Sequence, residues 1–386
     1  MKIAFIADSF LLDQSTGVNG TQVQLYNLAQ AFKRRGIEVH YVALTGKLQK
    51  DCEVIAGIKL RWIKQRNGIF SWIYYMVDYF SILNQIQPDV IFQRGRSYLT
   101  YVAGEWSRKN GKKFIWGTNG EDGCDFWKNM KRLMKSRSSL WKKRLLSPNA
   151  LLQDIFIHRG IRRTEIAINQ TENQKRKLWN NFRKKGIVIT SYFPVAEDGL
   201  GPRKKEKAVF WLANLSPGKQ PEVFLKLAEH CQDCEGWEFV LGGGTMDKVY
   251  FEKISEQAKL LRNVDLVGRI PFEESNEFFS KVSLFVNTSI MEAEGIPNTF
   301  IQAWLSSTPV LSLVHDPNGW IKRHNLGFCA EGNLSDFLEK GKTLISNENA
   351  LVALGENGRN FALNKFAREK IIDAYIRLFR VRCYGK

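Results

Sequence analysis

The chain has 386 residues and a formal net charge of +18, from 57 Lys and Arg against 39 Asp and Glu. This length predicts two domains, each large enough to bury its own core without disulfides or structural metals. The positive charge favours nucleotide phosphates, nucleic acid or an anionic membrane as partners, without choosing among them. Six scattered cysteines are too few for a secreted disulfide scaffold, so we expect a reducing, cytoplasmic setting.

No targeting or membrane-spanning segment is expected. Residues 1–8 form an apolar run that is too short for a signal peptide and is typical of a buried strand. The most apolar later stretch, 69–83, contains Asp78 and is shorter than the ~20 apolar residues that a membrane span needs. Both features favour a cytoplasmic protein.

Short apolar runs alternate with helical patterns along the chain, which is typical of parallel strands joined by crossover helices. The expected strands lie at 3–7, 39–44, 90–92, 114–116 and 187–190 in the first half, and at 209–213, 239–241, 284–287 and 310–313 in the second. Between the first two strands, a helix with an apolar face ends in basic residues followed by the helix stop Gly36. The predicted fold class is α/β, with two Rossmann-like domains.

A polar stretch separates the two series of strands. It follows Pro194, contains Gly199 and Gly201, and has no apolar period, as expected of an interdomain linker. The predicted division is a first domain at 1–195, a linker at 196–207, a second domain at 208–366 and a C-terminal helix at 367–386, for which packing on the first domain is one option. Two such domains would face each other across a cleft at the carboxyl ends of both sheets, where open α/β sheets bind ligands.

The sharpest motif follows the predicted strand that ends at Asn287. It reads Glu294-Gly-Ile-Pro-Asn298, with Gln302 eight positions after Glu294. A helix opens near Pro297, a residue suited to a first helical turn. Because the N–H groups of a first turn are free and the helix dipole adds positive charge, an anion would bind there. Glu294 and Gln302 would reach separate hydroxyls of one extended ligand.

This motif resembles the signature of family 4 retaining glycosyltransferases, which have the GT-B fold of two Rossmann-like domains. In that signature, Glu-Gly-Phe-Pro-Asn is followed by a second glutamate eight positions after the first. The resemblance implies that Glu294 is catalytic and contacts the donor hexose, and that position 302 holds the ribose diol. The backbone groups that it implies for sugar and diphosphate are those of Gly295, Ile296, Pro297 and Asn298. Gln302 departs from the pattern, since an amide bonds a hydroxyl without charge assistance.

A second motif follows the first strand of the second domain, where the sequence reads Asn214-Leu-Ser-Pro-Gly-Lys219. A lysine between a strand end and a helix start can neutralise a β-phosphate, where charge develops as the sugar leaves. Lys219 is therefore expected both to bind the donor and to act in catalysis. The resembling family often has an arginine where this chain has Asn214, which donates a hydrogen bond but carries no charge.

Three further stretches are predicted to contribute to binding. The strand and turn at 264–270 resemble the family's main-chain reader of the nucleobase, with a plain strand end as the alternative; the residues concerned are Gly268, Arg269 and Ile270. The turn before the first helix, where the family has Gly-Gly, would approach the ligand closely through Gly17, Asn19 and Gly20. The loop after 116 lacks the histidine that relatives carry, and its polar candidates, with a solvated loop as the alternative, are Asn119, Glu121 and Asp122.

No metal or organic cofactor is expected, and a nucleoside diphosphate sugar is the co-substrate. The chain has no Asp-x-Asp triplet of the kind that holds diphosphate through a divalent ion. The run Gly242-Gly243-Gly244 lacks the spaced glycines of a dinucleotide fingerprint.

The segment from Phe126 to Leu146 has eight Lys or Arg and no acid, with apolar residues recurring near helical spacing. Such a basic amphipathic segment is able to lie on an anionic membrane surface, which would place the protein peripherally on the inner face of the membrane. A basic solvated helix packed on its own domain is the alternative.

The sequence therefore predicts a transferase that moves a hexose or N-acetylhexosamine from a nucleoside diphosphate sugar to a glycan or a lipid-linked acceptor, with retention, in cell-surface polysaccharide synthesis. The alternatives on the same fold are a sugar-nucleotide epimerase or a phosphorylase, which would form product without an acceptor or need phosphate. A basic nucleic-acid-binding protein is suggested by charge alone. Because no nucleic-acid module is recognisable, nucleic acid is not an expected partner.

Overall fold

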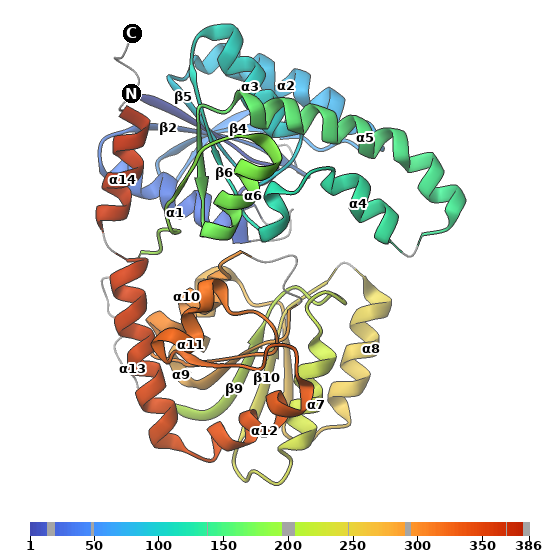
Figure 1. Cartoon of the computed structure of the whole chain (residues 1–386), viewed down its shortest axis with the longest axis vertical. Helices are drawn as coiled ribbons and strands as arrows, with labels where there is room; N and C mark the ends of the chain where they lie inside the picture. Colours follow the sequence, from blue (N-terminus) through green and yellow to red (C-terminus); the bar gives the residue numbers. More distant parts are fainter. Residues whose placement is uncertain are drawn as a thin grey trace. The chain divides into compact units, whose positions relative to one another are not determined.

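The computed structural model describes residues 1–13, 20–47, 50–136, 138–194, 205–245, 247–289, 295–367 and 369–380. It divides the chain into two compact units, which are Met1–Tyr192 with Glu369–Lys386, and Phe193–Arg368. Each unit has its own mainly parallel sheet flanked by helices (Figure 1). Both units are therefore α/β in class.

The first unit is built on an eight-stranded sheet in the order β3-β4-β2-β1-β5-β6-β7-β8. Its strands are β1 Lys2–Ile6, β2 Glu38–Thr45, β3 Cys52–Ile55, β4 Ile58–Lys64, β5 Val90–Arg94, β6 Lys113–Gly117, β7 Ile166–Asn169 and β8 Gly186–Val188. Its helices are α1 Gly20–Arg34, α2 Ser71–Ile86, α3 Tyr98–Asn110, α4 Lys128–Lys135, α5 Leu140–Arg163, α6 Glu172–Phe182 and α14 Glu369–Arg380. Among these described strands, β3 and β4 form an antiparallel hairpin at the edge, and the remaining neighbours are parallel.

Both faces of this first sheet are buried, because successive residues of its strands are apolar. On one face Ile3 and Phe5 pack with α1 and α14, and on the other face Ala4 packs with α2, α3 and α5. The ring of Phe379 in α14 lies 5.1 Å, between centroids, from that of Phe32 in α1. The C-terminal helix therefore belongs to the first unit.

A buried ion pair attaches the hairpin of α4 and α5 to this sheet. The Arg96 guanidinium, shortly after β5, lies 3.0 Å from the Asp154 carboxylate in α5, and the two side chains are 2% and 0% exposed. Asp154 also accepts hydrogen bonds from the backbone N–H groups of Asn129 (3.3 Å) and Met130 (3.0 Å) at the start of α4. Arg96 donates in addition to Nε2 of His158 (3.1 Å). These contacts fix α4 against α5 near the carboxyl end of β5.

The second unit is built on six parallel strands in the order β11-β10-β9-β12-β13-β14. Its strands are β9 Glu206–Leu212, β10 Glu238–Gly242, β11 Val264–Gly268, β12 Val282–Asn287, β13 Val310–Ser312 and β14 Gly327–Cys329. Its helices are α7 Pro221–His230, α8 Lys248–Lys259, α9 Phe272–Lys281, α10 Asn298–Leu305, α11 Trp320–His324, α12 Leu334–Ile345 and α13 Glu348–Lys365. The strand order reverses between β9 and β12, and open α/β sheets bind ligands outside the carboxyl ends of the strands at such a reversal.

The structure differs from the predicted elements at several places. β9 begins at Glu206, inside the range predicted as linker (196–207), because Glu206 already pairs with Val282 in β12. The strand predicted at 187–190 is β8, Gly186–Val188. The sequence does not predict β3, β4, β7 or β14; β7 and β14 have four and three residues, too few to show a period. Within the described residues, no helix combines the length and the apolar content needed to cross a bilayer.

Candidate functional site

Lys219 lies where the strand order of the second unit reverses. It follows β9 in a turn in which its N–H group donates to the carbonyl of Ser216 (2.9 Å). Its own carbonyl accepts from the hydroxyl of Thr288 (2.6 Å), the residue directly after β12. That hydroxyl in turn accepts from the indole N–H of Trp211 in β9 (2.8 Å). This series of hydrogen bonds joins the loops that follow β9 and β12 and fixes the backbone of Lys219 between them.

His315 joins the loop after β13 to the loop before α10. Its Nε2 lies 2.6 Å from the carbonyl oxygen of Gly295, which can only accept, so we assign the proton to Nε2. The His315 carbonyl accepts from the hydroxyl of Ser312 at the end of β13 (2.7 Å). Burial lowers the pKa of His315, and the charge of Lys219 is close enough to lower that pKa as well. Lys219, Gly295 and His315 therefore occupy one neighbourhood, in which the imidazole is neutral.

The first turn of α10 begins beside this neighbourhood. The helix starts at Asn298, three residues after Gly295, with Pro297 as its N-cap. No side chain caps this turn, and the turn contains no acidic residue. Because uncapped N–H groups and the helix dipole make the start of a helix electropositive, an anion is stabilised there. The buried side chain of Ile296 anchors the loop that leads into the turn.

Glycine backbone joins the carboxyl ends of β9, β10 and β11. The N–H of Gly243 donates to the carbonyl of Gly268 (2.7 Å), and the N–H of Leu215 donates to the carbonyl of Gly244 (3.0 Å). Gly243 has a φ of 151°, and a Cβ there would lie 2.0 Å from the carbonyl oxygen of Ala213. Only glycine fits this position. The edge of the candidate site beside β11 is therefore built from closely packed main chain.

The other predicted donor-binding residues surround this backbone. Asn214 and Arg269 are exposed, and Ile270 is half-buried. Gly268, the last residue of β11, has a φ of 71°. All four follow or end β9 or β11 at the carboxyl edge of the sheet, so the structure places them on the same side of the unit as Lys219.

Gln302 is held inside the second unit by α9. It is 4% exposed, and its amide nitrogen donates to the hydroxyl of Ser275 (2.8 Å) and to the side-chain oxygen of Asn276 (3.0 Å). Because both amide hydrogens are engaged, a ribose hydroxyl would have to donate to the amide oxygen. Glutamine supplies two donors that a glutamate at this position would lack, which gives a local reason for the departure from the family pattern.

Three predicted site residues, Gly17, Asn19 and Glu294, lie outside the described residues. In the first unit, Gly20 opens α1, and the hydroxyl of the next residue, Thr21, accepts from the amide of Asn119. Asn119, in the loop after β6, therefore contacts the residue next to Gly20, so two of the separately predicted residues lie close together. The Glu121 carboxylate instead accepts from the hydroxyl of Thr171 (2.7 Å), the N-cap of α6.

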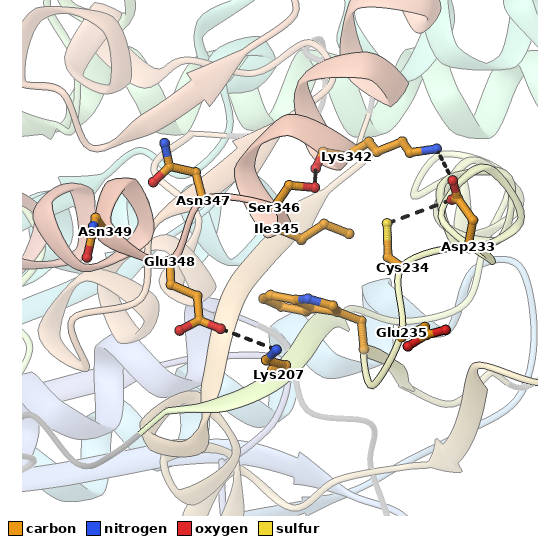
Figure 2. A pocket seen from close by; sticks show the side chains of 11 residues that line it. Lys207, Asp233, Cys234, Glu235, Lys342, Ile345, Ser346, Asn347, Glu348 and Asn349 are labelled. Carbon is orange, nitrogen blue, oxygen red and sulfur yellow. Dashed lines mark hydrogen bonds and ion pairs between the residues drawn. The ribbon is translucent and has the colours of Figure 1, made fainter.

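A hollow of about 630 Å³ lies at the opposite ends of the strands of the second unit. Its lining includes Lys207 at the start of β9 and Trp237 directly before β10 (Figure 2). Lys207 pairs with Glu348 (3.4 Å), and Lys342 pairs with Asp233 (2.6 Å). Because this hollow lies at the amino ends of β9 and β10 and its lysines are paired with carboxylates, it does not meet the requirements of a diphosphate site.

Two family models match the chain in consecutive segments. Residues 195–361 match the model described as Glycosyl transferases group 1, and residues 18–168 match the model described as Glycosyltransferase Family 4. Together these segments cover most of both units. The chain belongs to the group 1 glycosyltransferases.

Curated relatives match this glycosyltransferase over part of their length. It is 26% identical over 215 residues to the poly(ribitol-phosphate) alpha-N-acetylglucosaminyltransferase of Staphylococcus aureus, an alignment that covers 54% of this chain and 42% of the relative. It is 27% identical over 126 residues to the lipopolysaccharide core biosynthesis glycosyltransferase LpsE of Rhizobium meliloti, covering 31% of this chain and 36% of the relative. The alignments therefore span less than half the length of these two relatives.

Solved glycosyltransferase structures resemble both units of the chain. The G117R mutant of S. aureus TarM, in complex with fondaparinux, alpha-GlcNAc-glycerol and UDP, matches with a TM-score of 0.71 at 14% identity and covers 98% of this chain and 99% of its own. WaaG, a glycosyltransferase involved in lipopolysaccharide biosynthesis, matches with a TM-score of 0.71 at 12% identity, with the same two coverages. At these identities the likeness shows the fold, which is GT-B.

Three residues that hydrogen-bond within the candidate site are missing from the sequence prediction: Trp211, Thr288 and His315. Thr288 directly follows β12, and His315 follows β13 by three residues. A polar residue just beyond the carboxyl end of a parallel strand is a signal that would have found both of them. Trp211 lies within a buried strand, where an indole is indistinguishable in sequence from any other core residue.

Replacing His315 by alanine is expected to raise the KM for the sugar donor about tenfold, with a smaller change in kcat, because one buried hydrogen bond to the Gly295 loop is lost. His315→Gln retains an N–H donor and should recover part of the loss. Steady-state kinetics with varied donor separates the two parameters. Equal KM values for the wild type and His315→Ala would show that this contact does not position the donor loop.

The pH dependence of kcat/KM for the donor is expected to follow the titration of the Lys219 ammonium. Burial lowers the pKa of its ammonium to about 8. The amine is charged below that pH and neutral above it, so kcat/KM for the donor should fall as pH rises through about 8. In Lys219→Arg, where the guanidinium stays charged, the fall should move to higher pH. Rate profiles measured between about pH 6 and 10 test this expectation, and identical profiles for the two proteins would contradict it.

Proposed function

We propose that the protein transfers a sugar from a nucleoside diphosphate sugar to a glycan or a lipid-linked acceptor, with retention of anomeric configuration, in cell-surface polysaccharide synthesis. The observation that carries the proposal is the position of Lys219 at the strand reversal of the second unit, hydrogen-bonded through its backbone to Thr288 and close to His315. A cation and the start of a helix at this point suit a diphosphate.

In the proposed reaction, the bond between the anomeric carbon and the β-phosphate oxygen breaks and a bond to the acceptor oxygen forms. The Lys219 ammonium and the first turn of α10 stabilise the negative charge that develops on the leaving diphosphate. Glu294, by its place in the motif, orients the sugar. The departing phosphate takes the acceptor proton, so no additional base is needed. With this charge balanced by the protein, transfer proceeds without a metal ion.

The donor class follows from the same residues and from the relatives. The glycine backbone beside β11 would hold the base through main-chain groups, and the Gln302 amide oxygen would accept one ribose hydroxyl. The S. aureus relative is named an alpha-N-acetylglucosaminyltransferase, and the similar structure of the TarM mutant is a complex that includes UDP. A uridine diphosphate hexose or N-acetylhexosamine is therefore the first donor to test.

The experiment combines the protein with nucleotide sugars and with glycan and lipid-linked acceptors, in the presence and absence of EDTA. The expected result is an acceptor-dependent product whose anomeric configuration, read by NMR, matches that of the donor, with no loss in EDTA. Release or isomerisation of the sugar without an acceptor would support the epimerase alternative, and a requirement for phosphate would support the phosphorylase alternative. A salt-sensitive gel shift without any transfer would support nucleic-acid binding instead.

A further inference from the structure

The first turns of α2 carry apolar side chains on both faces. The inner face of the helix, which includes Tyr75 and Tyr79, is buried in the core of the first unit. The outer face of the first turns exposes Ile73, Tyr74 and Val77, and the two residues that precede the helix, Ile69 and Phe70, are exposed as well. A surface helix of a soluble protein normally presents polar residues on its outer face. The outer face of α2 therefore requires a partner or an environment of its own.

The neighbouring helix α5 has a similar strip. Its exposed apolar residues are Leu140, Trp141, Leu145, Leu151, Leu152 and Ile155, and Met134 at the end of α4 is exposed as well. Leu140 and Trp141 are 83% and 81% exposed. In Figure 1, α4 and the first turns of α5 extend beyond the sheet of the first unit as a helical hairpin. This strip therefore lies along the outside of the unit.

The two strips lie next to each other. The indole N–H of Trp72 in α2 donates to the side-chain oxygen of Asn149 in α5 (2.9 Å), and the Trp72 ring lies 5.7 Å, between centroids, from that of Phe156. These contacts join the first turn of α2 to the middle of α5, between Leu145 and Leu152. Of the twenty large hydrophobic side chains exposed in the described residues, twelve belong to these two strips and Met134. We call this set the outer apolar surface.

Positive charge borders the outer apolar surface. From Phe126 to Gln153 the sequence contains no Asp or Glu. Among the described residues of this stretch, the exposed cations are Lys131, Arg132, Lys135, Lys142 and Arg144. A second copy of the chain would bring the same positive charge to the contact, so self-association is disfavoured. Apolar side chains beside cations complement a bilayer with anionic headgroups, which accepts both.

We infer that α2 and the α4–α5 hairpin form one docking surface for an anionic phospholipid bilayer, with the outer face of α2 entering the boundary between headgroups and acyl chains. This surface extends the segment Phe126 to Leu146 predicted from sequence. Within that segment Trp127 and Met130 are half-buried, whereas α2 adds an apolar face that the prediction does not include. The inference relies on the proposed function only for its purpose, which is access to a lipid-linked acceptor.

Vesicle flotation with the full chain tests the inference, using phosphatidylcholine vesicles with and without phosphatidylglycerol. The wild type is expected to float with the anionic vesicles only. Ile73→Ser combined with Val77→Ser on α2, and Lys142→Glu combined with Arg144→Glu on α5, should each reduce the bound fraction about tenfold. Val249→Ser combined with Leu260→Ser, at positions 76% and 82% exposed in the second unit, is the matched control and should float like the wild type.

Equal flotation with and without phosphatidylglycerol, or wild-type flotation of the α2 variant, would overturn the inference. Light scattering without lipid provides a second check. If the wild type forms a dimer and the α2 variant is a monomer, the surface binds a second copy of the chain, which would also overturn the inference. The α2 variant should keep the wild-type melting temperature and full transfer to a water-soluble acceptor. Because flotation needs neither donor nor acceptor, its failure and a failure of the proposed function are read separately.

Discussion

Lys219→Ala is expected to lower kcat/KM for the sugar donor by about 100- to 1000-fold, as removal of one preorganised charge-stabilising group does in other enzymes. The reason is geometric. The Lys219 backbone is fixed by Thr288 between the loops after β9 and β12, and its charge acts on His315, which contacts the Gly295 carbonyl three residues before α10. Without the Lys219 ammonium, the start of α10 is the group left in this neighbourhood to stabilise the leaving diphosphate.

The measurement for Lys219 is transfer kinetics together with thermal unfolding. Unfolding should change little, because burial already disfavours the charged form of this side chain. Lys226→Ala is the matched control, since Lys226 is an exposed lysine of α7, the helix that follows the same loop. Wild-type turnover in Lys219→Ala, or an equal loss in Lys226→Ala, would remove Lys219 from the reaction.

Asp154→Ala is expected to lower the free energy of unfolding by about 3–5 kcal/mol, the usual cost of breaking a buried ion pair by removing one partner. The carboxylate is 0% exposed and balances the buried Arg96 guanidinium, and it also accepts from two N–H groups at the start of α4. Its removal leaves a buried charge and unpaired backbone donors. Chemical denaturation with urea measures the loss.

The matched control for Asp154 is Glu172→Ala, because Glu172 pairs with Lys175 at 3.2 Å on the surface of α6, with side chains 73% and 45% exposed. Such an exposed pair contributes about 0–1 kcal/mol. Similar losses for the two variants would mean that the Arg96–Asp154 pair does not hold the hairpin. If the free energy of unfolding of Asp154→Ala depends less steeply on urea concentration than that of the wild type, the substitution has changed the native or denatured ensemble instead.

The α/β class and the two-unit division are predictable from sequence because parallel strands buried on both faces are short, continuous apolar runs. β1 and β9 are such runs, and α1 shows the 3.6-residue period of a helix that packs on β1. The positions of Lys219 and of the start of α10 are also predictable, since each lies in the connection between a strand and the helix that follows it, and the attraction for anions is a local property of such a connection.

Other features depend on residues that are distant in sequence. A proline inside a helix removes one backbone hydrogen bond, yet α5 runs from Leu140 to Arg163 through Pro148, where packing on α3 and the Asp154 ion pair support it. The Gln302 amide is oriented by Ser275 and Asn276 in another helix. These partners are set by tertiary packing, which no single-sequence pattern contains.

The outer apolar surface shows a second limit of sequence reading. The run from Ile69 to Leu83 is too short for a membrane span, and the structure buries only part of it, including Tyr75 and Tyr79. The exposure of Ile73 and Val77 becomes visible only when α3 and α5 are placed beside α2. Periodicity cannot distinguish a helix buried on all sides from one with an exposed apolar face.

The central claim is that Lys219 and the start of α10 form a diphosphate pocket in the second unit. Isothermal titration of each nucleoside diphosphate and its monophosphate, into the wild type and into Lys219→Ala, tests it most directly. For the nucleobase that the protein recognises, the wild type should bind the diphosphate at least about tenfold more tightly than the monophosphate, because a charge-assisted contact is added. Lys219→Ala should lose most of this preference for the diphosphate. A diphosphate preference that survives unchanged in Lys219→Ala, or no nucleotide binding at all, would contradict the claim.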